Sequence, residues 1–220
     1  KSKTFPNLLA KVFHERDIPI QVAVGNYDLG ICGLDWIEEL LVKYPSSALV
    51  KVKNLEYGKS ALYMAVSGSG DVATAEEMQA KPGIMRIASE YPNLAESFAL
   101  KNRLRRFSIF PLWGAAEVYP PESADLALIS AGKEEGFNCG LVPVSKVLDF
   151  SAFLIANKNS WERKDINNIL ASIYDELVVS EKQPSPTGVV TMPEVARQHP
   201  STLAEGIVRL ALPDGHQQLP

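Results

Sequence analysis

Short apolar runs alternate along the chain with segments whose apolar side chains recur at helical spacing. Apolar runs bounded by turn residues are typical of buried strands, and a period of three to four residues is typical of helices with one buried face. The predicted strands cover residues 28–31, 48–52, 60–66, 85–89, 107–110, 125–129, 153–157 and 207–212. The predicted helices cover residues 16–24, 35–44, 74–79, 92–101 and 165–178. This alternation predicts an α/β protein with mainly parallel strands.

The order of these segments favours two lobes. The first lobe is predicted to combine residues 1–82 with residues 148–220, and the second to cover residues 83–147. Residues 182–206 contain four prolines and little periodicity, so we expect a linker or an extended surface arm there. In folds of this kind the default ligand site is the cleft at the carboxyl ends of the strands.

The composition excludes several function classes. The chain has 220 residues, of which 46% are hydrophobic and 22% charged, as in ordinary globular proteins. A net charge of −4 argues against a general nucleic-acid binder. No apolar run reaches the roughly 20 residues that cross a bilayer, and the first residues lack the apolar core of a signal peptide. Only Cys32 and Cys139 occur, without nearby Cys or His partners, so we expect a cytoplasmic protein without disulfides or zinc.

The segment Tyr-Asp-Leu-Gly-Ile-Cys-Gly-Leu-Asp-Trp at residues 27–36 is the most informative one. It reads as a buried strand that enters a turn with Gly30 and Gly33 and then a helix with Asp35 in its first turn. Glycine lets the backbone approach a ligand, and the N–H groups at a helix start can hold an anion. This turn predicts a small, charged ligand. Cys32 is expected to be a small buried residue rather than a nucleophile.

Seven short motifs follow one another along the chain. They are Arg-Asp-Ile-Pro at 16–19, Asp-Leu-Gly-Ile-Cys-Gly-Leu-Asp at 28–35, Gly-Lys at 58–59, Arg-Ile-Ala-Ser-Glu-Tyr-Pro-Asn at 86–93, Gly-Ala-Ala-Glu-Val at 114–118, Gly-Leu-Val-Pro-Val at 140–144 and Ser-Ala-Phe-Leu-Ile-Ala-Asn at 151–157. Taken in this order, they resemble the ATP phosphoribosyltransferase family in its short catalytic-subunit form. The resemblance implies a two-lobed α/β fold like type II periplasmic binding proteins, with the ligand cleft between the lobes. It also implies that ATP and phosphoribosyl pyrophosphate react to give phosphoribosyl-ATP and pyrophosphate, with Mg²⁺ accompanying the phosphorylated substrate. The partner that it implies is a regulatory subunit like histidyl-tRNA synthetase, in an oligomer.

Three features depart from the family pattern. Residues 207–218 resemble the family's opening strand but follow the rest, as in a circular permutation or the start of a second copy. The family's first helix and second strand are then expected to be missing, which would leave one sheet face uncovered. Leu-Pro-Asp-Gly-His at 212–216 replaces the usual Leu-Pro-Lys-Gly-Arg, and residues 128–136 match the phosphate loop Asp-Leu-Val-Ser-Thr-Gly-x-Thr-Leu only in part.

The resemblance also assigns candidate substrate-binding residues. Asp35 is expected at the nucleotide, although a first-turn acid favoured by the helix dipole is the alternative. Glu117 is expected near the ribose hydroxyls. Lys59 and Arg86 are candidates for phosphates, with solvated charges or ion-pair partners as alternatives, and Glu90 or Tyr91 is expected at the cleft edge.

Two loops complete the candidate set. Ser130, Gly132 and Lys133 are predicted to form an anion cradle, which neighbouring glutamates oppose. Gly215 and His216 follow the last strand. His216 is either a weak phosphate donor, a metal-assisted contact or a surface histidine.

Two functions follow from these observations, and a third is weaker. The first is an ATP phosphoribosyltransferase. The second is a catalytically weakened homologue that binds a nucleotide or another small anion, because the phosphate loops differ from the family pattern. A periplasmic solute-binding protein is the third, and the lack of a signal peptide counts against it.

Overall fold

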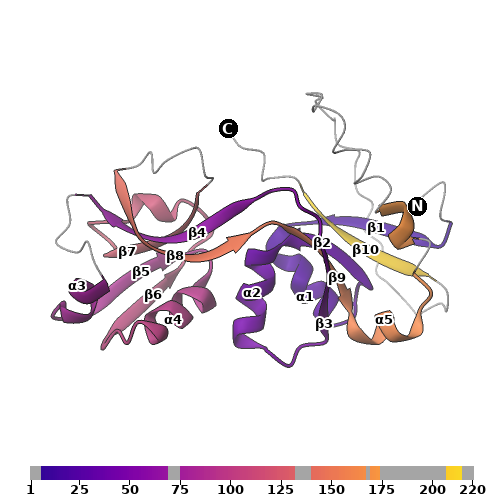
Figure 1. Cartoon of the computed structure of the whole chain (residues 1–220), viewed down its shortest axis with the longest axis horizontal. Coiled ribbons are helices and arrows are strands. Elements are labelled where there is room, and N and C mark those ends of the chain that lie inside the picture. The colour runs from indigo at the N-terminus through magenta and orange to yellow at the C-terminus, as the bar shows by residue number, and fades with distance from the viewer. Residues whose placement is uncertain (1–5, 69–74, 132–139, 167–168, 174–206, 215–220) are drawn as a thin grey trace.

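The computed structural model describes residues 6–68, 75–131, 140–166, 169–173 and 207–214. These residues form two five-stranded mixed sheets that lie side by side, as Figure 1 shows. The first sheet has the order β1 (Leu8–Phe13), β10 (Val208–Pro213), β2 (Leu29–Gly33), β9 (Ala152–Asn157) and β3 (Leu49–Asn54). The second has the order β6 (Phe107–Pro111), β5 (Met85–Ser89), β7 (Leu126–Ala131), β4 (Ser60–Ser67) and β8 (Leu141–Phe150). The two-lobed α/β prediction is therefore confirmed.

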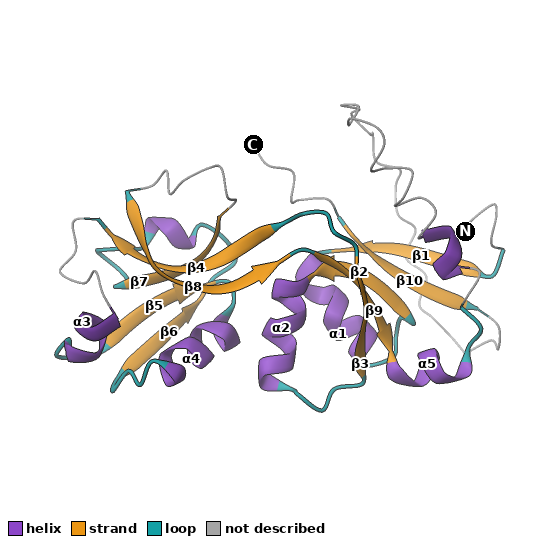
Figure 2. Ribbon diagram, in the orientation of Figure 1, coloured by secondary structure: helices purple, strands orange, loops and turns teal. Residues whose placement is uncertain are grey.

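The helices cover the faces and ends of these sheets. They are α1 (Ile18–Ala23), α2 (Leu34–Lys43), α3 (Ala75–Ala80), α4 (Pro92–Lys101), α5 (Lys158–Arg163), the short 3-10 turns η1 (Glu15–Asp17) and η2 (Ala116–Val118), and a helical segment at 169–173. In Figure 2, α2 lies on the side of the first sheet that faces the second lobe, and it contacts both α4 and β8. Among the helices of the described residues, none combines the length and apolar character that crossing a membrane requires.

The strand directions differ from the prediction of mainly parallel pairing. β1, β10 and β2 are mutually parallel neighbours, as are β6, β5 and β7. The pairs β2–β9, β9–β3, β4–β7 and β4–β8 are antiparallel. The antiparallel pairs arise because the chain crosses between lobes at two places, after β3 and after β8, and each return strand enters its sheet in the opposite direction.

The predicted lobe boundaries at residues 82 and 148 need correction. β4 begins at Ser60 and already belongs to the second sheet, because it pairs with β7 and β8. β8 extends that sheet to Phe150. Figure 1 shows β4 and β8 leading from one lobe into the other, so the second sheet spans residues 60–150.

The last described strand completes the first sheet. β10 lies between β1 and β2, with Leu210 opposite Leu29 and Val208 opposite Leu8. This confirms that residues 207–212 share a sheet with residues 28–31. On its other side β10 pairs with β1 along its whole length. The expected uncovered face is wrong, since α1 packs on one face and Ile166 with the 169–173 segment on the other.

A buried carboxylate holds β10 in place. Asp28, at the start of β2, accepts hydrogen bonds from the backbone N–H of Arg209 at 2.8 Å and from the hydroxyl of Ser160 at 2.6 Å. The Lys164 ammonium lies 3.0 Å from both Asp28 oxygens and also donates to the carbonyl of Ile207 at 2.9 Å. A buried charge needs such partners to offset its desolvation. Asp28 therefore ties three chain segments together.

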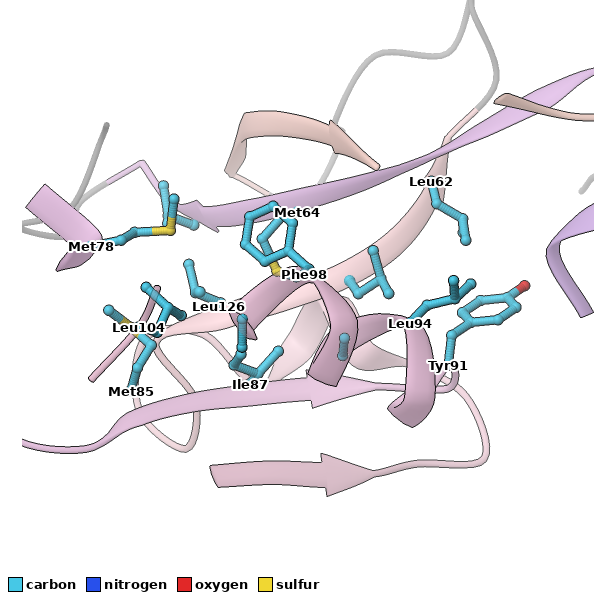
Figure 3. Packing of buried hydrophobic residues seen from close by; sticks show 14 of the residues in the cluster. Leu62, Met64, Met78, Met85, Ile87, Tyr91, Leu94, Phe98, Leu104 and Leu126 are labelled. Atoms are coloured by element: carbon cyan, nitrogen blue, oxygen red, sulfur yellow. The ribbon is translucent and has the colours of Figure 1, made fainter. Parts of the chain in front are cut away.

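The core of the second lobe extends beyond its own sheet. Figure 3 shows Leu62, Met64, Ile87, Phe98 and Leu126 packed against one another from β4, β5, α4 and β7. Tyr91 lies at the edge of this cluster and its hydroxyl points away from it. Trp36 of α2, from the first lobe, belongs to the same cluster. The two lobes thus share apolar packing where α2 meets α4.

Gly30 is required by packing on the first sheet. A Cβ at this position would lie 2.7 Å from Cγ2 of Ile18 and 2.9 Å from Cγ2 of Val22, both in α1. The absent side chain lets α1 lie close to β2. The predicted substrate contact of Gly30 therefore has a competing explanation in helix packing. Cys32, two residues further on, is buried in the same apolar cluster, as expected.

Replacing Gly30 by alanine is expected to lower the free energy of unfolding by about 1–3 kcal/mol, the usual cost of overpacking a core. Urea unfolding measures the change. In a Val22→Ala background the cost of G30A should shrink, because one contacting methyl is gone. An equal cost in both backgrounds would show that α1 does not set the requirement.

Candidate functional site

The parallel strands of both sheets end at the junction between the lobes. β1 leads into His14, Glu15 and Arg16, β10 into Asp214, and β2 into Asp35. From the second lobe, β5 leads into Glu90 and Tyr91, and β6 leads toward Trp113. Contacts across the junction include Tyr91 with Asp35 and Arg16 with Trp113. Carboxyl ends of parallel strands are the usual ligand sites of α/β proteins.

Asp35 is fully buried at this junction. Its Oδ2 accepts a hydrogen bond of 2.6 Å from the hydroxyl of Tyr91 in the other lobe. Burial raises the pKa of Asp35, although this hydrogen bond and the nearby N–H groups of residues 35 and 36 lower it in part. Its Oδ1 is buried without a hydrogen-bond partner among the described residues. A buried acceptor of this kind favours a donor from a ligand.

Gly33 is required by its neighbour Asp35. Gly33 precedes α2 with an ordinary φ of −67°, so a left-handed conformation is not the reason for glycine. A Cβ at this position would overlap Oδ1 of Asp35. Gly33 therefore leaves room for the Asp35 carboxylate, and its ligand role stays a prediction.

Several carboxyl groups face one another at the junction. Burial, together with the negative charges of Asp35 and Asp214, raises the pKa of Glu15 to about 7. Burial and the charge of Glu117 raise the pKa of Glu90. The structure thus places Glu117, predicted near a ribose, on the same side as Glu90, with opposing positive charge from His14 and Arg16.

The two predicted phosphate-binding cations have partners elsewhere. Arg86 lies near the start of β5 and donates to Asp125 through Nη2 at 3.1 Å and Nε at 3.3 Å. It also donates to the carbonyls of Pro121 and Glu122, so its ion-pair alternative is the one that the structure supports. Lys59 forms an exposed ion pair of 3.0 Å with Glu56 in the crossing segment. Its phosphate role stays a prediction.

The predicted anion cradle is only partly described. Ser130 is exposed near the end of β7, and its Oγ lies 3.1 Å from Oγ of Ser60. The candidates Gly132, Lys133, Gly215 and His216 lie outside the described residues.

Glu39 joins the two lobes. Helix α4 begins after Tyr91, which makes no side-chain capping bond, so its first N–H groups need other acceptors. The buried carboxylate of Glu39 accepts from the N–H of Asn93 at 2.9 Å and of Leu94 at 2.8 Å. Burial raises the pKa of Glu39, although these two N–H groups favour its charged form. A residue of one lobe thus caps a helix of the other.

Sequence reasoning did not select three residues that the fold brings to the junction. Glu15 directly precedes the Arg-Asp-Ile-Pro motif and Arg16 is its first residue, but the motif was noted only as a family marker. The indole of Trp113 lies 4.3 Å below the guanidinium of Arg16. The signal available for Trp113 was an aromatic residue directly before the Gly-Ala-Ala-Glu motif at 114–117.

The carboxylates of the junction do not form a metal centre. Among the described residues there is no group of three or more His, Cys, Asp or Glu side chains placed to hold a metal ion.

The chain matches one family over most of its length. The family model for ATP phosphoribosyltransferase matches residues 14–175. The ATP phosphoribosyltransferase of Sulfurisphaera tokodaii is 33% identical over 173 residues, which are 76% of this chain and 57% of that protein. That of Metallosphaera sedula is 31% identical over 203 residues, 89% of this chain and 68% of that protein. The chain spans little more than half the length of several such relatives.

Solved structures support the fold. The ATP phosphoribosyl transferase (HisG:HisZ) complex from Thermotoga maritima matches with a TM-score of 0.62 and 19% identity, covering 77% of this chain and 78% of that chain. A mutant of ArgBP from T. maritima matches with a TM-score of 0.50 and 17% identity, covering 77% of this chain and 71% of that chain.

Removal of the Glu39 carboxylate is expected to destabilise the junction. Glu39→Ala leaves two helix N–H groups without their acceptor and should lower the free energy of unfolding by about 1–2 kcal/mol, as for other lost caps. Glu38→Ala is the matched control on the same helix, because Glu38 only forms a part-exposed ion pair with Lys51. That pair should contribute at most about 1 kcal/mol. Equal losses in urea unfolding would count against the interlobe cap.

Glu15 is expected to make stability depend on pH. Its folded pKa of about 7 exceeds the ordinary value of 4.5. Between these values the folded protein keeps a proton that the unfolded chain releases, so Glu15 lowers stability as the pH rises through this window. Glu15→Gln should gain about 2–3 kcal/mol relative to the parent protein between pH 4.5 and pH 8. Urea unfolding at several pH values would refute this if the difference stayed constant.

Proposed function

The chain belongs to the ATP phosphoribosyltransferase family, and on that premise we propose that it joins ATP to phosphoribosyl pyrophosphate in the first step of histidine biosynthesis. The products are phosphoribosyl-ATP and pyrophosphate. The observation that carries this proposal is the family match over residues 14–175, a range that contains all seven motifs of the family. The names of the similar proteins agree with it.

The reaction requires positioning more than covalent catalysis. A bond forms between an adenine nitrogen and the ribose carbon that loses pyrophosphate, so the protein must hold the two atoms close and in line. We assign the nucleotide to the side of Asp35, whose free Oδ1 is a buried acceptor. The carboxylate of Glu117 then accepts hydrogen bonds from the ribose hydroxyl groups. Tyr91 keeps the Asp35 side chain in place through its hydrogen bond.

The departing pyrophosphate needs positive charge and N–H donors. The candidates for this positive charge are Lys133 and His216, from the two loops that lie outside the described residues. Magnesium enters this proposal bound to the phosphorylated substrate, since the described residues hold no metal cluster.

The proposal also includes a partner subunit and a cellular compartment. A companion subunit like histidyl-tRNA synthetase would assemble with this chain in an oligomer. The similarity of the fold to one chain of the HisG:HisZ complex supports such an assembly. We expect the protein to act in the cytoplasm, where ATP is supplied.

A second candidate function is nucleotide binding without transfer. The observation that favours it is Asp214, which stands where the family pattern has lysine and whose negative charge helps to raise the pKa of Glu15. An anion here opposes the phosphates of the second substrate. The chain would then bind ATP and leave phosphoribosyl pyrophosphate unreacted.

A turnover assay tests both candidates. The 220-residue chain, with ATP, phosphoribosyl pyrophosphate, Mg²⁺ and the companion subunit, is expected to form phosphoribosyl-ATP. Asp214→Lys should raise kcat/KM for phosphoribosyl pyrophosphate about tenfold, equivalent to about 1.4 kcal/mol. Asp214→Asn is the control that removes a charge without adding one, and its gain should be smaller. No product from any of the three proteins, with ATP binding retained, would favour the second candidate.

A further inference from the structure

Trp113 is the most exposed large apolar side chain of the described residues. It is 87% exposed, although burying an indole is strongly favourable. The residue lies in the short segment between β6 and η2, on the lobe junction. A solvent-exposed aromatic ring at a candidate ligand site is suited to stack on a planar group of the ligand.

The backbone around Trp113 holds the indole outward. The N–H of Leu112 donates to the carbonyl of Ser89 at 2.9 Å, which fixes the segment to the end of β5. Directly after the tryptophan, Gly114 has φ 135° and Ala115 has φ 55°. Ala115 is thus held in the left-handed region, which is unfavourable for residues with a side chain. The backbone therefore turns sharply at Gly114 and Ala115, and the Trp113 side chain stays exposed to solvent.

Arg16 of the other lobe contacts this indole. Its guanidinium carbon lies 4.3 Å from the ring centroid, within the range of cation–π contacts. The positive charge of Arg16 also acts on Glu39 and Glu90. A flat apolar ring and a cation thus lie together at the junction, with Glu117 four residues further along the chain.

We propose that Trp113 is the platform on which the adenine ring of ATP stacks, on the indole face opposite the one that Arg16 covers. This inference rests on the proposed function, because ATP is the only one of its two substrates with an aromatic ring. Stacking on a side chain accounts for the exposed indole.

The three tryptophans allow a direct binding test. Trp36 is buried and Trp161, in α5, is 39% exposed. In a Trp161→Phe protein, Trp113 is therefore the indole that reports on solvent. ATP is expected to quench its fluorescence and to protect it from acrylamide, whereas phosphoribosyl pyrophosphate alone is not. Unchanged acrylamide quenching at saturating ATP would overturn the proposal.

Affinity and kinetics give a second readout. Trp113→Ala should weaken ATP binding about tenfold or more, the scale of losing one base–aromatic stack, and Trp113→Phe should recover much of that loss. The KM for ATP should rise while the KM for phosphoribosyl pyrophosphate stays within about twofold. Trp161→Ala is the matched control and should leave both values unchanged.

The outcomes separate this inference from the proposed function. If no phosphoribosyl-ATP forms but ATP binding depends on Trp113, the platform stands and the transfer reaction fails. If turnover is normal and Trp113→Ala binds ATP as well as the parent protein does, the platform fails and the function stands. A change in oligomeric state without a change in ATP affinity would instead assign Trp113 to a protein interface and overturn the proposal.

Discussion

The geometry of the junction depends on the contact between α2 and α4. Glu39 caps α4 from the other lobe, and Trp36 adds an indole to the core of that lobe. Because orphan N–H groups at a buried helix start are costly, this contact fixes one lobe against the other. It also brings Asp35 within hydrogen-bond distance of Tyr91 and Arg16 over Trp113. The candidate site is therefore a property of both lobes together.

Charge is distributed unevenly over the junction. On the side of Asp35 and Tyr91, a buried acceptor, an exposed indole and a guanidinium suit a nucleotide. Burial and the charges of Asp35 and Asp214 raise the pKa of Glu15, and this concentration of carboxyl groups opposes a second polyphosphate. The proposed nucleotide site therefore draws on described residues, whereas the proposed phosphoribosyl transfer depends on cations supplied by the substrate complex and the loops.

Local signals predicted the central elements well, and long-range contacts explain the differences. Residues 85–89 and 92–101 were assigned correctly because an apolar run and then a proline set their limits. β1 and β8 were missed because both are edge strands with exposed polar positions, such as Lys11 and Lys146, and lack the apolar pattern of central strands. The roles of Gly30 and Gly33 depend on α1 and on the Asp35 carboxylate, contacts that no local pattern reveals.

The position of β10 has a consequence for how the protein is made. The second sheet draws on residues 60–150 without interruption, so it can form while the rest of the chain is still being synthesised. In the first sheet β10 is synthesised after β1 and β2 but lies between them. The hydrogen bond from the N–H of Arg209 to the carboxylate of Asp28 can form only after β10 has been synthesised. Closing such a long sequence separation is entropically slow. The order of the strands along the chain therefore allows the second lobe to fold before the first lobe closes.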